Sequence, residues 1–328
     1  MPIQSLLITG VTGFVGSHVA EAVAGRVSSI RALARSSSQR DRLEQLGFQY
    51  IAGSLEDAES VRGAVEGVEV VVHMAAATRA GSEAEFLRVN AQGTRTLADA
   101  IRQSRHPPHR LVYLSSLAAA GPARNGRPVT ADDEPAPLTA YGRTKLAGER
   151  ICSELSDFCQ VIVLRPPAVY GPRERDLLEF FRLARWGVLP VPTGPARPLQ
   201  MVHARDLARA VVMAATADRA RGVYHIAEPS AHTWEEICRM LAGAVARRAR
   251  LVKVPAALIT AAAVLSEGWG KLIRQPSIFS RDKARELLAP GWLCETEAAQ
   301  RDIGFRTEIP LEQGLSETAK WYRAHGWL

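Results

Sequence analysis

Cysteine and lysine are scarce in this sequence of 328 residues. The four cysteines show no CxxC spacing and have no clustered histidines beside them, which argues against a disulfide framework, a zinc site and a redox pair. We expect them to be small buried apolar residues, and we expect no metal site. Lysine occurs at only five positions, so arginine is the main cation of the chain.

Long hydrophobic runs are also missing. The longest, near Val254–Leu265, is well short of the roughly 20 residues that span a bilayer, so we expect no integral membrane segment. We interpret this run as a core helix, with peripheral membrane contact as a minor alternative. The first residues enter an apolar strand at once, without the features of a signal peptide, and we expect a cytoplasmic protein.

The charges do not gather into a patch. The formal net charge is +7, but acidic and basic residues are interleaved, without the basic stripe and aromatic residues of a nucleic-acid binder. We therefore expect no nucleic-acid partner. With 47% hydrophobic and 23% charged residues the chain can bury a sizeable core, which excludes a disordered protein.

From Ile3 to about Leu164, short aliphatic runs alternate with longer amphipathic stretches. This rhythm predicts an α/β fold with a Rossmann-type doubly wound parallel sheet. The expected strands are Leu6–Thr9, Ile30–Ala34, Gln49–Ala52, Val70–Met74, Leu111–Ser115 and Val161–Leu164. The expected helices begin near Gly13, Gln39, Asp57, Ser82 and Ala140.

The pattern changes after Arg165, where prolines punctuate a stretch with one clear helix around Leu177–Arg185. We predict a smaller mixed α/β C-terminal substrate domain. The strands Gln200–His203 and Val223–Ile226 are candidates to return to the first sheet, and the helix Asp206–Ala215 lies between them. The predicted Rossmann domain comprises residues 1–166 and about 199–217, and the predicted substrate-binding region about 167–198 and 218–328.

A glycine-rich turn, Thr9-Gly-Val-Thr-Gly-Phe-Val-Gly16, follows the first expected strand. Its glycines permit the tight turn, close backbone approach and free N–H groups at a helix start that a dinucleotide pyrophosphate needs. The spacing is GxxGxxG, where the familiar fingerprint is GxGxxG, and an ordinary glycine turn is the alternative. The expected cofactor contacts in this turn are Gly10, Thr12, Gly13, Phe14, Val15 and Gly16.

The end of the second expected strand indicates which dinucleotide binds. NAD-specific folds usually place an acidic residue there to hold the ribose 2′-hydroxyl, and this chain has none. Arg35 instead offers a planar fork for a 2′-phosphate, with Ser36 and Ser37 as further donors. NADP is therefore the predicted cofactor, and NAD the less favoured alternative.

Tyr141 and Lys145 stand four residues apart at the start of an expected helix, and so lie on one face of it. Free tyrosine has a pKa of about 10, and a cation about 4 Å away would stabilise the phenolate by roughly 1–4 kcal/mol. We therefore expect Lys145 to lower the pKa of Tyr141. Such a phenol could give a proton to a carbonyl oxygen that receives hydride, or take one from an alcohol that loses it.

Five motifs, in order along the chain, carry a resemblance to a known family. They are TGxxGxxG at Thr9–Gly16, HMAAA at His73–Ala77, YLSSLAAAGP at Tyr113–Pro122, YxxxK at Tyr141–Lys145 and RPPAVYGP at Arg165–Pro172. Together they resemble an extended short-chain dehydrogenase/reductase of the NAD-dependent epimerase/dehydratase superfamily. Within it, the chain is most similar to the branch of 3β-hydroxysteroid dehydrogenase-like and dihydroflavonol reductase-like enzymes.

The resemblance implies a role for each matched residue. Ser116 would hydrogen-bond the substrate oxygen, and Tyr141 would act as general acid/base. Lys145 would hold the nicotinamide ribose. Asn90 matches a helix asparagine that supports the site indirectly. Ser115 and His73 are expected to be structural, with the Ser115 hydroxyl bound to backbone.

The resemblance also implies further cofactor contacts, at Ala75, Ala76 and the turn from Pro166 to Val169. Where the family often has Gly-Asp after its third strand, this chain reads Gly53-Ser54-Leu55, so contacts of Ser54 and Leu55 with adenine would be weaker or made by the backbone. Where its nucleotide-sugar enzymes usually carry an asparagine, this chain has Ala168, which disfavours that substrate class.

An apolar substrate pocket is the natural expectation, since the C-terminal region offers apolar residues and no cluster of acids. The candidates are Phe180, Phe181, Trp186, Leu189, Trp269, Ile273 and Phe279, with the alternative that most form that region's own core. We predict an NADP-dependent oxidoreductase that acts on a ketone or secondary alcohol of a mainly apolar small molecule. The alternatives are an NAD-dependent nucleotide-sugar epimerase or dehydratase, and a sensor that binds NADP without turnover. A homodimer is expected from the family.

Overall fold

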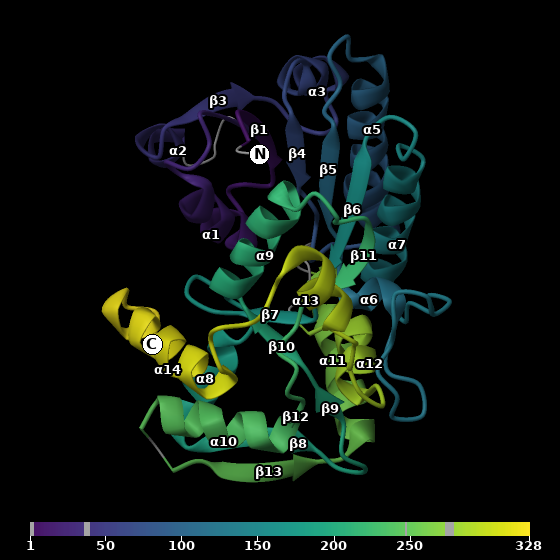
Figure 1. The fold of residues 1–328 in the computed structure, drawn as a ribbon. Helices are drawn as coiled ribbons and strands as arrows, with labels where there is room; N and C mark the ends of the chain where they lie inside the picture. The colour runs from purple at the N-terminus through teal and green to yellow at the C-terminus, as the bar shows by residue number, and fades with distance from the viewer. Residues whose placement is uncertain (1–2, 36–39, 247, 273–278) are drawn as a thin grey trace.

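Seven parallel strands form one sheet in the N-terminal part of the chain (Figure 1). The computed structural model describes residues 3–35, 40–246, 248–272 and 279–328. The strands of this sheet are β1 (Ser5–Thr9), β2 (Ser29–Ala34), β3 (Phe48–Ala52), β4 (Val70–His73), β5 (Arg110–Leu114), β6 (Gln160–Arg165) and β11 (Gly222–His225). Their order is β11-β6-β5-β4-β1-β2-β3, which reverses between β1 and β4, where doubly wound folds bind ligands.

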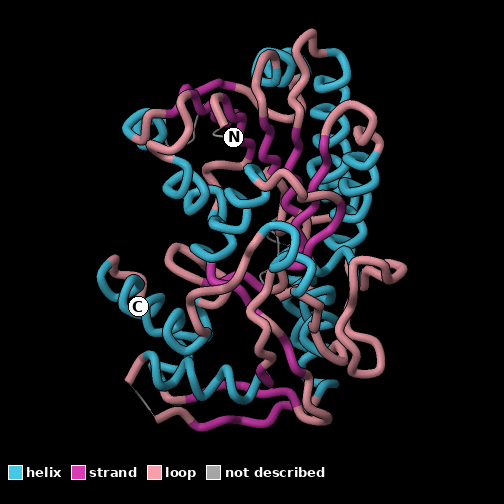
Figure 2. Tube along the Cα trace, viewed as in Figure 1, coloured by secondary structure: helices cyan, strands magenta, loops and turns pink. Residues whose placement is uncertain are grey.

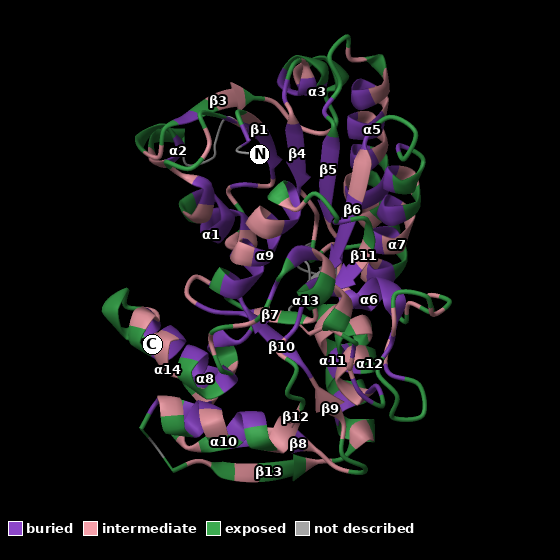
Figure 3. Ribbon diagram, in the orientation of Figure 1, coloured by how far each residue is buried: buried purple, intermediate pink, exposed green. Residues whose placement is uncertain are grey.

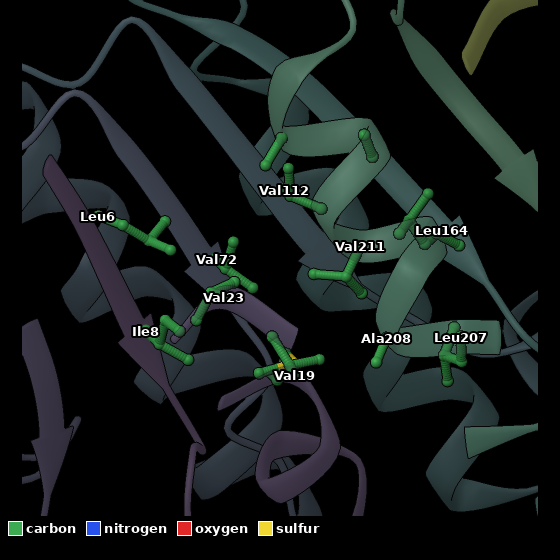
Figure 4. Packing of buried hydrophobic residues seen from close by; sticks show 14 of the residues in the cluster. Leu6, Ile8, Val19, Val23, Val72, Val112, Leu164, Leu207, Ala208 and Val211 are labelled. Atoms are coloured by element: carbon green, nitrogen blue, oxygen red, sulfur yellow. The ribbon is translucent and has the colours of Figure 1, made fainter. Parts of the chain in front are cut away.

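Helices cover both faces of this sheet. They are α1 (Phe14–Val23), α2 (Arg40–Gln45), α3 (Ala58–Val65), α4 (Glu83–Phe86), the π-helix η1 (Leu87–Gln92), α5 (Gly93–Gln103), α6 (Leu117–Ala120), α7 (Ala140–Ser153) and α9 (Ala204–Thr216). Successive side chains of a strand point to opposite faces. Leu6 therefore packs with α1 and α9, as Figure 4 shows, whereas Leu7 packs with α3 and α5. Both β4 and β5 are buried (Figure 3), which explains their continuous aliphatic runs.

The expected helix starts are confirmed, and short polar side chains account for three of them. Asp57, Ser82 and Thr139 each accept a hydrogen bond from a backbone N–H in the first turn of the helix that follows. Such caps satisfy N–H groups that have no partner within the helix. The cap at Thr139, two residues before Tyr141, fixes the start of α7 at Ala140.

The C-terminal part contains short strands and longer helices around a second core (Figure 2). Its elements are β7 (Ala168–Tyr170), α8 (Leu178–Trp186), β8 (Val188–Pro192), β9 (Pro198–Leu199), β10 (Met201–His203), β12 (His232–Thr233), α10 (Trp234–Ala244), β13 (Arg250–Val254), α11 (Ala256–Leu272), α12 (Arg281–Leu288), α13 (Glu297–Ile303) and α14 (Leu311–Ala324). Phe181, Leu241 and Tyr322 lie at the centre of this core.

The two strands expected to return to the first sheet behave differently. The later one is confirmed, because β11 pairs with β6. It lies outside the residue ranges predicted for the Rossmann domain. The expectation for Gln200–His203 was wrong: β10 pairs with β7, in a separate two-stranded sheet. β11 occupies the edge of β6 that is not paired with β5, so β10 pairs instead with β7, the strand that follows β6 in the chain.

The apolar run near Val254–Leu265 does form a helix, α11, but the expectation that this helix is a core helix was wrong. Ile259 and Ala263 pack against Ala284 of α12, while most of the other described side chains of α11 face solvent. The four cysteines are buried and free, as expected. Within the described ranges, no helix is both long and apolar enough to cross a membrane.

Candidate active site

A cavity of about 1970 Å³ lies at the carboxyl ends of the central strands, between the two parts of the chain. Sites for one small molecule are usually about 300–1,000 Å³, so this cavity has room for a dinucleotide and a second ligand together. Residues from the expected cofactor and catalytic sets line it: Gly10, Thr12, Gly13, Phe14, Val15, Gly16, Ala76, Ser116, Tyr141, Lys145, Pro166 and Val169.

The glycine-rich turn has the shape that a pyrophosphate requires. Gly10 has a φ of +74°, and a Cβ there would lie 2.5 Å from the Ala75 nitrogen. A Cβ on Gly16 would lie 2.1 Å from the Gly10 carbonyl oxygen. No side chain caps α1 at Gly13, so the first N–H groups of α1 remain available to an anion. These residues fit a dinucleotide, which this turn would hold by its phosphates.

The residues expected around the adenosine lie away from this cavity lining. Arg35 is exposed at the end of β2, and Ser36 and Ser37 fall outside the described residues. The Ser54 hydroxyl accepts a hydrogen bond from Glu56, and Leu55 packs on Gly93. The Ala75 N–H donates to Thr9. Whether these residues contact a cofactor stays a prediction.

Tyr141, Lys145 and Ser116 meet at the cavity. The Ser116 and Tyr141 side chains both line the cavity, and the Ser116 hydroxyl caps α6 by accepting from the Ala118 N–H at 3.1 Å. Lys145 is only 1% exposed, and its Nζ lies 4.2 Å from the centroid of the Tyr113 ring. This contact of an ammonium with an aromatic face holds the Lys145 side chain in the interior.

The expectation that Lys145 lowers the pKa of Tyr141 is contradicted. Removal of water by the surrounding protein raises the pKa of Tyr141 to about 12, although the nearby Ser116 hydroxyl acts in the opposite direction. Burial lowers the pKa of Lys145 to about 8. The Lys145 ammonium lies against the Tyr113 ring, and Lys145 is not among the groups that shift the pKa of Tyr141. At neutral pH the phenol therefore carries its proton.

Asn90 supports the site through the loop after β4. Its Oδ1 accepts from the Ala77 N–H at 2.7 Å, and its Nδ2 donates to the Ala77 carbonyl and to the Thr144 hydroxyl, each at 3.1 Å. Asn90 thus joins this loop to α7 beside Lys145. His73 is structural as expected, because its two ring nitrogens contact the hydroxyls of Thr9 and Thr94.

A buried ion pair beneath the site was not anticipated from the sequence. Arg165 donates to both carboxylate oxygens of Glu149, at 2.9 and 2.6 Å. The expected backbone partner of Ser115 was wrong, because its hydroxyl bonds to Glu149 as well. Glu149 therefore links α7 to Ser115 and to Arg165, which directly precede Ser116 and Pro166 in the chain. Because Glu149 stands four residues after Lys145, the sequence already places the two on one face of α7.

Aromatic side chains of the C-terminal part line one wall of the cavity. Phe180 packs edge-on against Trp234 with ring centroids 4.8 Å apart, and both line the cavity together with Phe279. The cavity residues missed from the sequence include Trp234, Trp292 and Trp327.

The other aromatic and aliphatic candidates have different places. Phe181 and Leu189 belong to the second core, whereas Trp186 and Trp269 are exposed. Ile273 falls outside the described residues. The sequence therefore identified an apolar wall without separating its members from the core and the surface.

Known proteins resemble this chain over nearly its whole length. The family model for the NAD dependent epimerase/dehydratase family matches residues 6–227. A ceramide reductase of Caulobacter vibrioides is 32% identical over 324 residues, which cover 98% of this chain and 95% of that protein. A 4-hydroxy-2-methyl-3-oxo-4-farnesyl-3,4-dihydroquinoline-1-oxide ketoreductase of Stigmatella aurantiaca is 27% identical, over 94% of this chain and 93% of that protein.

Solved structures share the fold. DesIV, a dTDP-glucose 4,6-dehydratase of Streptomyces venezuelae solved with NAD bound, superposes with a TM-score of 0.79 at 22% identity, over 99% of this chain and 98% of that one. At this identity the likeness shows the fold alone. With the family model and the curated relatives, it completes the assignment: the chain belongs to the NAD dependent epimerase/dehydratase family and is an NAD(P)-dependent oxidoreductase of the extended short-chain dehydrogenase/reductase type.

Proposed function

We propose that this enzyme is an NADP-dependent ketoreductase for a lipid-like ketone. The observation that carries the proposal is the meeting of Ser116, Tyr141 and Lys145 in a cavity whose opposite wall is aromatic. The names of the two curated relatives point the same way, because ceramide and a farnesyl group both carry long hydrocarbon chains. An aromatic wall would bury such a chain favourably.

Each catalytic residue has a defined task in this reaction. The Ser116 hydroxyl would hydrogen-bond the carbonyl oxygen of the ketone, and the Tyr141 phenol would donate its proton to the same oxygen. The Tyr141 phenol carries its proton at neutral pH, as a general acid in the reductive direction requires. Lys145 would donate hydrogen bonds to the nicotinamide ribose. Bound NADPH supplies the hydride.

The alternatives fit less well. Ala168 lines the cavity and offers no polar group to a sugar nucleotide. A sensor would not require the complete set of Ser116, Tyr141 and Lys145. A cytoplasmic location and a homodimer stay predictions.

A substrate panel tests the proposed reaction. We expect purified enzyme to oxidise NADPH with long-chain ketones at a higher kcat/KM than with short-chain ketones of the same head structure, because the aromatic wall binds the chain. The measurement is the initial rate of absorbance loss at saturating NADPH. The proposal would be wrong if the enzyme bound NADPH and reduced no ketone but converted a dTDP- or UDP-sugar. That result would support the nucleotide-sugar epimerase or dehydratase instead.

The choice of cofactor is tested separately at Arg35. We expect Arg35→Asp to lower the ratio of kcat/KM for NADPH to that for NADH by at least about tenfold, since a hydrogen bond to a charged group contributes about 1.5–3 kcal/mol. Arg105→Asp is the matched control. Arg105 is also exposed, but it precedes β5 and so lies near the amino ends of the strands, whereas Arg35 follows the carboxyl end of β2. An unchanged ratio in Arg35→Asp would show that Arg35 does not contact the 2′-phosphate.

A further inference from the structure

The exposed side of α11 is apolar along its described length. Leu258, Leu265 and Trp269 are 60%, 74% and 64% exposed, and their spacing of seven and four residues places them on one face of the helix. The other residues exposed between Leu258 and Trp269 are Thr260, Ala261, Ala262, Val264 and Gly268, none of them charged. Large apolar side chains exposed singly are ordinary, but a continuous row of them marks a binding surface.

Three positively charged residues precede α11 in the chain. Arg248, Arg250 and Lys253 are exposed in and beside β13, immediately before α11, and none of them forms an ion pair with a described residue. No aspartate or glutamate occurs in the sequence from Val245 to Ser266. An apolar helix face next to unpaired cations complements an anionic bilayer surface, where hydrocarbon lies under a negatively charged layer.

The far end of α11 reaches the cavity. Glu267 lines the cavity and forms an ion pair with Arg281 at the start of α12, at 3.7 Å. Phe279, just before α12, lines the cavity as well. The C-terminal part of α11 therefore adjoins the cavity through the face that packs on α12, whereas the apolar row lies on the opposite face.

The dimensions argue against a second copy of the chain as the occupant. A helix of 17 residues is about 25 Å long and about 10 Å wide, so one face covers about 250 Å² on each copy. Two such faces bury about 500 Å² in total, against the roughly 1,200 Å² or more of a stable interface. A bilayer needs no matching partner surface, because a helix can lie with its apolar face about 5–10 Å deep in the headgroup region.

We propose that α11 docks the enzyme on an anionic membrane surface, with Leu258, Leu265 and Trp269 in the lipid and Arg248, Arg250 and Lys253 at the headgroups. The docking surface is independent of the proposed ketoreductase activity, since vesicle binding is measured without substrate or cofactor.

Vesicle flotation tests the proposal. We expect the enzyme to float with vesicles of phosphatidylcholine and phosphatidylglycerol, and more weakly with phosphatidylcholine alone. Leu265→Gln and Trp269→Gln should each lower the partition coefficient at least about tenfold, because each removes a large apolar group from the lipid. Lys253→Gln should lower it about fivefold on the anionic vesicles only.

Trp186→Gln is the matched control, because Trp186 is 81% exposed on α8. It should change the partition coefficient less than twofold, and circular dichroism should show all four variants folded. Absence of vesicle binding by the unchanged protein overturns the proposal, and so does an equal loss in Trp186→Gln. If Leu265→Gln instead converts a dimer to a monomer with unchanged vesicle binding, the face belongs to a second copy and the proposal is wrong.

Discussion

Tyr141→Phe is expected to lower kcat for ketone reduction by about 10²–10⁴-fold, the usual contribution of a positioned general acid. The substitution removes the phenolic oxygen and keeps the ring, which packs against Phe86 with centroids 6.1 Å apart. The dissociation constant for NADPH, measured by fluorescence, should change less than about twofold. Loss of turnover with retained binding would identify the phenol as the proton donor.

The control for Tyr141→Phe is Tyr224→Phe. Tyr224 lies in β11, outside the cavity lining, and its hydroxyl accepts a hydrogen bond from the N–H of Arg221, the residue before β11, so its loss should leave kcat unchanged. Wild-type turnover in Tyr141→Phe would mean that another group protonates the substrate, and that Tyr141 is not the general acid. A parallel loss of NADPH binding would mean instead that the ring position had shifted.

Glu149→Ala is expected to lower the free energy of unfolding by about 3–5 kcal/mol, the cost of leaving one member of a buried ion pair without its partner. Arg165 is nearly inaccessible to water, and its Nη1 has no hydrogen-bond partner among the described residues even in the intact protein. The loss of Glu149 would also remove the partner of Ser115. Urea unfolding followed by circular dichroism measures the effect.

Glu154→Ala is the matched control, because Glu154 lies at the C-terminal end of the same helix, α7. Glu154 also pairs with two arginines, Arg95 and Arg102, but its side chain is exposed, and exposed pairs contribute only about 0–1 kcal/mol. Equal losses in Glu149→Ala and Glu154→Ala would show that burial does not distinguish the two pairs. Partial recovery in the double variant Glu149→Leu, Arg165→Leu would support the unpaired charge as the cause.

The parts of the fold that the sequence predicted depend on local patterns. The central strands β4 and β5 are buried almost throughout, so each appears as an aliphatic run that can be identified without knowledge of its neighbours. The phosphate-binding turn is equally local, because the positive φ of Gly10 and the tight packing at Gly16 restrict the residue type at each position. Candidate catalytic residues were found in the same way, from short motifs.

The errors share a different cause, since each involves a partner distant in sequence. Hydropathy identified α11 but could not show that α12 covers only one side of it. The spacing of Tyr141 and Lys145 was read correctly as a shared helix face, yet Tyr113, on another element, attracts the ammonium. The hydroxyl of Ser115 is similarly bound by Glu149, which lies 34 residues away.

Three side-chain pairs connect α7 to the end of β5 and the residues that follow it: Tyr141 with Ser116, Lys145 with Tyr113, and Glu149 with Ser115. Since a helix turns by about 100° per residue, inserting or deleting one residue between Tyr141 and Glu149 would rotate part of this set away from its partners. A single substitution affects one pair, whereas a change in length separates pairs that depend on one another. We therefore expect insertions and deletions to be tolerated better in the irregular loop 122–137, which joins the two elements outside the paired region.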